Sequence, residues 1–131
     1  MGKAVLMLLL ALASGHAAAD WRLVDISNDG TIAAYADPAT ISKSGYNVKI
    51  MTMFNYKRAR VVDGKPYLSY QSLDEYDCST GAMRSVSSTS YAKSMGEGEV
   101  VARDSTADAS FQPFPNDSLA SYMWEFACAK H

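Results

Sequence analysis

The stretch YNVKIMTMFNYK, residues 46–57, decides the fold of this 131-residue chain. Its apolar and aromatic residues alternate with polar ones, which is the period of a β-strand with one buried face. The members of the apolar set are Tyr46, Val48, Ile50, Phe54 and Tyr56. Because Met51 and Met53 interrupt the polar set, we expect the middle of this strand to be covered on both sides, as in the interior of a sheet.

Further strand-like segments lie on both sides of this one. The predicted strands are residues 21–26, 31–35, 46–57, 67–78, 82–91 and 99–102. Asp37-Pro38 is expected to end the second strand, because proline cannot donate to a ladder. Residues 57–65, with Asp63-Gly64 at their turn, and residues 104–115 are expected to be loops. Short connections between strands favour antiparallel neighbours.

The final segment changes its period from that of a strand to that of a helix. Apolar residues recur there at i, i+3, i+4, i+7 and i+8, which is one helical stripe. The members of the stripe are Ala120, Met123, Trp124, Ala127 and Cys128. We expect a helix over residues 118–129, capped by Asn116 or Asp117, with Cys128 on the side that faces the sheet.

Residues 1–19 are predicted to be a secretory signal peptide. A single positive charge at Lys3 precedes an apolar run over residues 4–13, and Ala17 and Ala19 are small residues at the positions that signal peptidase requires. The run is too short to cross a bilayer, which takes about 20 residues. No cysteine lies near the predicted cleavage point, so we expect an exported domain, residues 20–131, without a lipid anchor.

The chain contains two cysteines, Cys78 and Cys128. In the oxidising compartment that an exported protein reaches, two lone cysteines are expected to form a disulfide. The predicted fold class is therefore α+β: a six-stranded antiparallel sheet with a C-terminal helix packed on one face and tethered by this disulfide.

Composition excludes several classes of function. Of 12 basic residues, Lys3 leaves with the signal, so 11 face 14 acidic residues and the formal charge is −3. This balance gives no general attraction for nucleic acid. A second apolar segment that could span a membrane is absent from the sequence. We expect a single domain.

The sequence offers little for catalysis, metals or cofactors. His16 lies in the predicted signal and His131 is the last residue, so a histidine base for a nucleophile is not expected. The acidic group Asp74, Glu75 and Asp77 has two interpretations. It could hold calcium or act as an acid–base pair, or it could belong to a solvated strand, with Asp74 on one face and the other two on the opposite face. We predict no cofactor and no enzymatic activity.

Four basic residues, Lys57, Arg58, Arg60 and Lys65, crowd one segment. They could bind an anionic ligand such as a sulfated glycan or an acidic protein segment. Alternatively, they could form a charged hairpin that protects an exposed sheet edge from pairing. The tyrosines raise a similar choice, because Tyr67, Tyr70, Tyr76 and Tyr91 could form an adhesive surface or simply reflect the preference of tyrosine for strands.

The chain resembles the surface-adhesin protein E family of bacterial exported proteins over residues 21–128. The resemblance lies in WRLV at 21–24, DPATI at 37–41, KPYLSYQSLDEYDC at 65–78, SYAKSMGEGEVV at 90–101 and QPFPNDS at 112–118. It implies a six-stranded antiparallel sheet whose C-terminal helix is held by a disulfide, and Cys78 and Cys128 match the two cysteines concerned. It also implies binding to host extracellular-matrix or plasma proteins, and haem binding by a dimer.

Two hypotheses for the function follow. The first is a non-enzymatic exported binding module, periplasmic or at the cell surface, with a matrix or other envelope protein as its partner and Lys57, Arg58, Arg60 and Lys65 as candidate binding residues. The second is a periplasmic structural or envelope-stress protein that acts inside its own cell. A haem site has little support from the residues, because His131 is the only histidine beyond the predicted signal.

Overall fold

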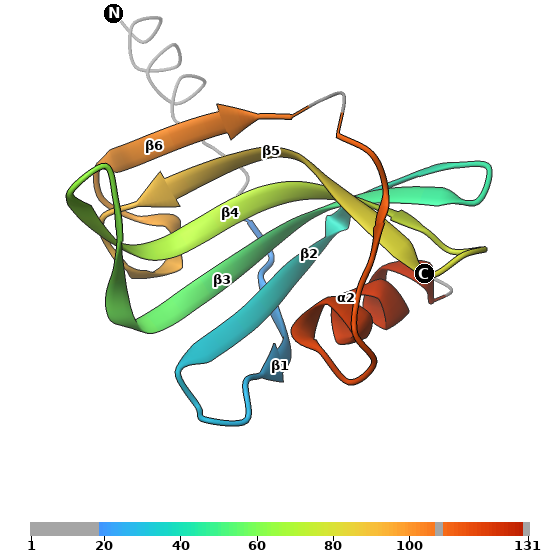
Figure 1. Ribbon diagram of the computed structural model, residues 1–131, viewed down its shortest axis with the longest axis horizontal. Helices are drawn as coiled ribbons and strands as arrows, with labels where there is room; N and C mark the ends of the chain where they lie inside the picture. The colour runs from blue at the N-terminus through green and yellow to red at the C-terminus, as the bar shows by residue number, and fades with distance from the viewer. Residues whose placement is uncertain (1–18, 107–108, 130–131) are drawn as a thin grey trace, which may run out of the picture.

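The computed structural model describes residues 19–106 and 109–129. The predicted signal peptide therefore lies outside the described residues, apart from Ala19. Six strands follow one another in chain order as an antiparallel meander, and the C-terminal helix α2 packs on one face (Figure 1). The strands are β1 (Arg22–Ile26), β2 (Ile32–Ser44), β3 (Asn47–Val62), β4 (Lys65–Asp77), β5 (Ala82–Tyr91) and β6 (Val100–Ser105). A two-residue strand, β7 (Gln112–Pro113), pairs with β5 within the segment predicted to be a loop.

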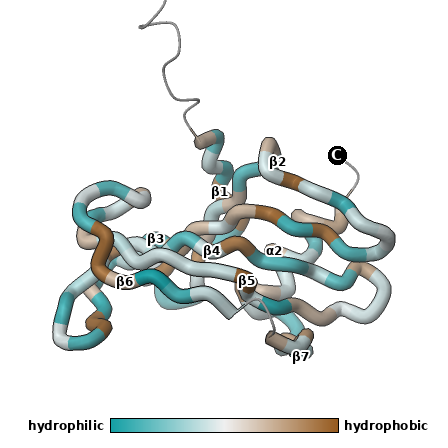
Figure 2. The backbone as a smooth tube through the Cα atoms, turned by 90° about the horizontal axis from the view of Figure 1, so that it is seen from above, coloured by the Kyte–Doolittle hydropathy of each residue, from teal (hydrophilic) through white to brown (hydrophobic). Residues whose placement is uncertain are grey.

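Strand β3 lies in the interior of the sheet, between β2 and β4, as its sequence predicts. Val48 and Ile50 are buried on the face that the helix covers, in one cluster with Tyr76 of β4 and Met123 of α2. Met53 is fully buried as well, close to the short 3-10 helix η1 (Ser94–Gly96). The hydropathy of the chain shows the matching pattern, with hydrophobic and hydrophilic residues alternating along the strands (Figure 2).

Strand β2 is longer than predicted, because Pro38 does not end it. The register with β3 shifts between Asp37 and Ser42, so Pro38 does not have to donate a hydrogen bond to the neighbouring strand. Polar side chains replace the lost ladder bonds: the Asp37 carboxylate accepts from the Ala39 N–H (3.0 Å), and the Thr40 hydroxyl accepts from the Met51 N–H (2.9 Å). The expectation of a break at Asp37-Pro38 is therefore wrong.

Residues 57–65 are a β-hairpin rather than a loop. Strands β3 and β4 pair beyond the rest of the sheet as far as Val62 and Lys65. The turn between them consists of Asp63 (φ 51°) and Gly64 (φ 76°). Two residues with positive φ suit a type I′ turn, whose twist matches that of the paired strands. The turn was predicted at the right residues, but its strands were predicted too short.

Helix α2 (Leu119–Cys128) begins one residue later than predicted, and Ser118 caps it. The Ser118 hydroxyl oxygen accepts a hydrogen bond from the Ser121 N–H at 3.2 Å. An N-cap residue takes an extended conformation, which Ser118 has, whereas Asp117 has a positive φ of 59°. The buried stripe itself is confirmed, since Met123 and Ala127 are almost fully buried against the sheet.

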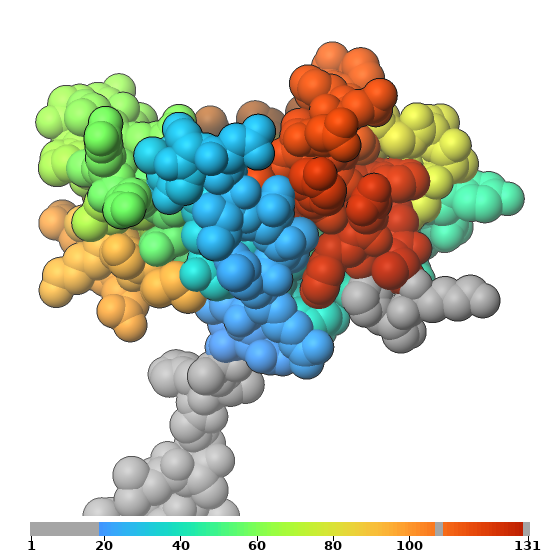
Figure 3. Space-filling view, turned by 90° about the horizontal axis from the view of Figure 1, so that it is seen from below, coloured from blue at the N-terminus to red at the C-terminus, as the bar shows by residue number. Residues whose placement is uncertain are grey.

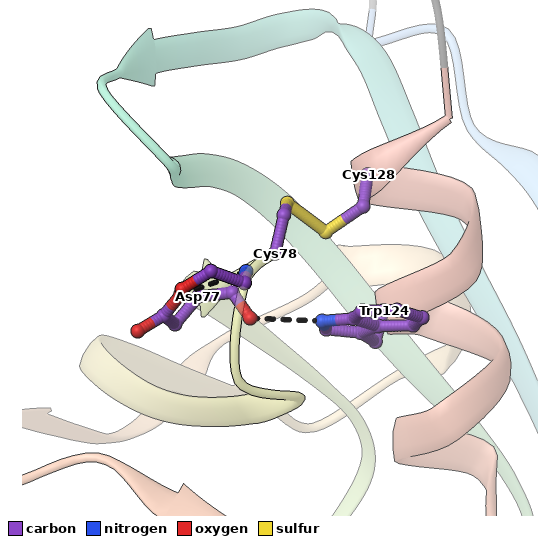
Figure 4. Close-up of a disulfide and its surroundings, with 5 residues drawn as sticks. Asp77, Cys78, Trp124 and Cys128 are labelled. Carbon is purple, nitrogen blue, oxygen red and sulfur yellow. Dashed lines mark hydrogen bonds between the residues drawn. A yellow bond between two sulfur atoms is a disulfide. The ribbon is translucent and has the colours of Figure 1, made fainter.

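The predicted disulfide joins Cys78, directly after β4, to Cys128 at the end of α2 (Figure 4). Beside it the Trp124 indole N–H donates to the Asp77 carbonyl oxygen at 3.0 Å. The helix also lies next to β1, as the view from below shows (Figure 3). The C-terminal part of the helix is thus held to the sheet by one covalent bond, one partly buried hydrogen bond and apolar packing. No helix among the described residues is long and apolar enough to cross a membrane.

Candidate functional site

The four basic candidates lie together on the hairpin of residues 57–65, which we call the basic arm. It projects at the end of the sheet opposite helix α2 (Figures 1 and 3). Lys57, Arg58, Arg60 and Lys65 are all exposed. The only ion pairs within the described part of the chain join Arg22 to Asp20 and Arg84 to Glu75, so no described carboxylate lies within 4.0 Å of the four cations.

Two tyrosines, Tyr56 and Tyr67, pack where the arm joins the rest of the sheet. Tyr56 is buried, and the guanidinium of Arg60 lies 4.3 Å from the centre of its ring. The ring of Tyr67 meets Tyr56 edge-on at 5.8 Å. Burial raises the pKa of Tyr56 to about 12, although the positive charge of Arg60 acts in the opposite direction. The contact with the buried Tyr56 ring orients the guanidinium of Arg60. This contact was not predicted from the sequence.

A shallow concavity of about 270 Å³ lies beside the arm, lined in part by Arg58, Arg60 and Asp29. Asp29 accepts hydrogen bonds from the Thr31 N–H and hydroxyl and from the Ser27 hydroxyl, which lower its pKa to about 2. The carboxylate is therefore engaged in shaping the turn before β2. The two guanidinium groups remain exposed, and their planar forks suit carboxylate or sulfate groups.

The edge-protection interpretation of the arm has a specific structural basis. The register of β2 against β3 ends at the Ile32–Tyr56 pair, and that of β4 against β5 begins at Ser69. The arm therefore extends beyond its neighbouring strands, and its charges protect two short free edges. This role and ligand binding are compatible, because both require exposed cations.

The acidic group is split between the two faces, but the expectation that it is solvated is wrong for two of its three members. Asp74 and Glu75 are only 7% and 6% exposed. Glu75 pairs with Arg84 of β5, whose guanidinium also lies over the ring of Phe111 at 4.6 Å. Asp77 alone is partly exposed, and hydrogen bonds from Ser79 lower its pKa.

Asp74 lies on the face covered by the helix, and its partners are hydroxyl groups. Ser72 donates to one carboxylate oxygen at 2.6 Å and Thr52 donates to the other at 2.8 Å. Ser85 extends this network, with its hydroxyl 2.8 Å from that of Ser72. Burial raises the pKa of Asp74, and the hydroxyl donors counteract part of that rise. Thr52 lies opposite Ser72, and Ser85 lies opposite Asp74. Ser72 and Asp74 are two positions apart on β4 and therefore share one face, which is the signal that could have revealed the network.

We expect the raised pKa of Asp74 to make stability fall as the pH rises from about 4, the ordinary value of an aspartate in an unfolded chain. Between that value and its raised pKa, the folded state binds more protons than the unfolded state, so rising pH favours unfolding. Urea unfolding of the wild type and of Asp74→Asn between pH 4 and 7 measures this contribution. The variant should show a flatter pH dependence, and an unchanged slope contradicts the assignment.

Asp77→Asn is the matched control for this measurement. The pKa of the Asp77 carboxyl is lowered in the folded protein. Its contribution to the free energy of unfolding is therefore lost as the pH falls below the usual pKa of an aspartate. The slope above pH 4 should therefore stay as in the wild type.

The four tyrosines of the predicted strands differ in burial. Tyr76 is 1% exposed and belongs to the core, whereas Tyr67, Tyr70 and Tyr91 are partly buried. The proposed adhesive surface of four tyrosines is therefore wrong as a group. Within the described residues, no cluster of three or more histidine, cysteine or acidic side chains could hold a metal ion.

Comparison with known proteins assigns the family. Residues 21–129 match the sequence profile described as Surface-adhesin protein E. The chain belongs to the surface-adhesin protein E family. Membership supports an exported, adhesin-like protein. No curated protein sequence matches the chain.

Solved structures of Haemophilus influenzae protein E have a similar fold. The crystal form II structure of Haemophilus influenzae protein E has a TM-score of 0.61 at 16% identity, over 86% of this chain and 90% of that one. A second structure of Haemophilus influenzae protein E has a TM-score of 0.58 at 16% identity, covering 86% of each chain. Protein E from non-typeable Haemophilus influenzae has a TM-score of 0.56 at 15% identity, over 86% and 78% of the two chains. At this identity the likeness concerns the fold.

Proposed function

We propose that this protein is an exported, non-enzymatic binding module that attaches to an acidic segment of a matrix, plasma or envelope protein through its basic arm. The observation that carries the proposal is the cluster of four exposed cations, which have no described carboxylate within 4.0 Å, on a hairpin projecting from the sheet. Family membership supports an adhesive role. Clustered cations steer and bind acidic partners where they outnumber the nearby carboxylates, and here four cations face two: Asp63 in the turn of the arm and Asp29 beside it.

Export is part of the same proposal. Residues 1–19 carry the features of a cleaved signal peptide. The Cys78–Cys128 disulfide supports it, because such bonds persist in the periplasm or outside the cell and are rare in the cytosol. Fractionation of a producing cell into medium, surface, periplasm and cytosol distinguishes an adhesin at the surface from a periplasmic protein.

The experiment is a binding assay of the exported, oxidised protein on immobilised basement-membrane extract and on bacterial envelope extract. We expect Arg58→Glu combined with Arg60→Glu to weaken binding at least about tenfold, which is about 1.4 kcal/mol. Raising the salt concentration should weaken wild-type binding in the same direction, because exposed charges are screened.

The matched control is Lys43→Glu combined with Lys49→Glu. Both lysines are exposed and lie near the β2–β3 turn, at the other end of β3 from the arm. The change in net charge is identical, so a general electrostatic effect should weaken both double variants equally. Equal binding of the arm variant and the wild type contradicts a role for the arm.

A further inference from the structure

A small cavity of about 190 Å³ lies between the sheet and the N-terminal half of helix α2. Its apolar wall includes Phe54 and Tyr70 from the sheet and Met123 from the helix. Phe54 and Tyr70 are only partly buried, so the cavity has a side that solvent can reach. Asp74 and its hydroxyl partners form the polar part of the lining.

The charge of Asp74 is not balanced by any cation in this cavity. No lysine, arginine or histidine is among the described residues that line it. The carboxylate is surrounded by hydroxyl dipoles: Ser72 and Thr52 donate to it, and the hydroxyl groups of Tyr76 and Ser85 also interact with it. A buried carboxylate loses hydration and is stabilised by a neighbouring positive charge. The lining therefore has the polarity that complements a cation with an apolar body.

The volume of the cavity limits the size of the apolar part of such a ligand. A cavity of about 150 Å³ holds one benzene molecule, whereas sites for drug-sized ligands span roughly 300–1,000 Å³. A volume of about 190 Å³ suits one ring with a short side chain. Aromatic walls favour an aromatic ring, because offset and edge-on ring contacts add to the burial of apolar area.

We propose that this cavity binds a small aromatic amine, whose ring packs against Phe54 and Tyr70 and whose ammonium group donates to the Asp74 carboxylate. The site shares no lining residue with the basic arm, although Phe54 of its wall contacts Tyr56, on whose ring Arg60 of the arm lies. A ligand bound here touches the sheet and Met123 of the helix together, so it also stabilises their contact.

The test is isothermal titration calorimetry of the exported, oxidised protein with 2-phenylethylamine. The neutral isostere 2-phenylethanol is the comparison ligand, because it has the same ring and length but no charge. We expect one amine to bind per chain and the alcohol to bind at least tenfold more weakly. Asp74→Asn should weaken amine binding at least tenfold, whereas Asp77→Asn, outside the cavity on the same strand, should bind as the wild type does.

Two further measurements guard against a variant that does not fold. Ala120→Leu places a larger side chain in the cavity wall from the helix and should weaken binding of both ligands. In the unaltered protein, NMR shift changes on adding the amine should centre on Phe54, Tyr70 and Ala120. Absence of binding at millimolar amine, equal binding of the alcohol, shift changes centred elsewhere, or unchanged binding by folded Asp74→Asn each overturns the proposal.

Discussion

Replacing both Cys78 and Cys128 with serine should lower the free energy of unfolding by about 4 kcal/mol. The bond closes a loop with a sequence separation of 50, and the chain-entropy estimate for such a loop is about 4 kcal/mol at 25 °C. For a domain of this size, a loss of that magnitude corresponds to a fall of about 15 °C in the midpoint of thermal unfolding. Urea and thermal unfolding, followed by circular dichroism, measure both quantities.

The control for this prediction is the wild type treated with a reductant strong enough to open the bond. It should unfold at the same midpoint as the double variant, because both lack the same constraint. The oxidised wild type should contain no titratable thiol, since both cysteines of the described chain are paired. Two free thiols in the exported protein, or an unchanged midpoint in the double variant, contradict the role given to the bond.

Met123→Ala should lower the free energy of unfolding by about 3 kcal/mol. Met123 is 2% exposed and joins helix α2 to Val48, Ile50 and Tyr76 of the sheet in one core cluster. Truncating a buried methionine loses its transfer free energy and leaves a cavity, for a total of about 2–5 kcal/mol. Chemical unfolding at neutral pH provides the measurement.

Tyr122→Ala is the matched control, because it truncates the adjacent side chain of the same helix. Tyr122 is 37% exposed, so we expect a much smaller loss of stability. Combining Met123→Ala with the double serine variant tests whether the disulfide and the packing of Met123 act together. A combined loss that differs from the sum shows coupling, which is expected for neighbouring groups that hold one helix. A loss for Met123→Ala no larger than that for Tyr122→Ala contradicts the packing described.

Two of the strands could be predicted closely. Strand β5 has the predicted bounds, and β3 occupies the interior position that Met51 and Met53 indicate. The stripe of α2 could also be predicted, because helical periodicity reflects burial on one side. The basic arm was different. Its charged residues carry no apolar alternation, so the turn at Asp63-Gly64 gave the only local signal for a hairpin.

The errors at Pro38 and in the acidic group share one cause, which is a partner remote in sequence. The hydroxyl of Thr40 bonds to the N–H of Met51 across the strand pair and compensates for the interrupted ladder. Thr52 reaches Asp74 across 22 positions, and Arg84 neutralises Glu75 from the next strand. A carboxylate with such partners can be buried, but no pattern within a single strand indicates which partners it will have.

The sequence by itself determined the order of the strands, the helical stripe and the pair of cysteines available for a disulfide, because these follow from periodicity and residue chemistry along the chain. Only the tertiary structure decided that Asp74 lies beside a cavity under α2, that Arg60 stacks on a buried tyrosine, and that the arm extends beyond its neighbouring strands. The physical reason is that burial and electrostatic environment depend on contacts between distant segments, which the order of residues does not display.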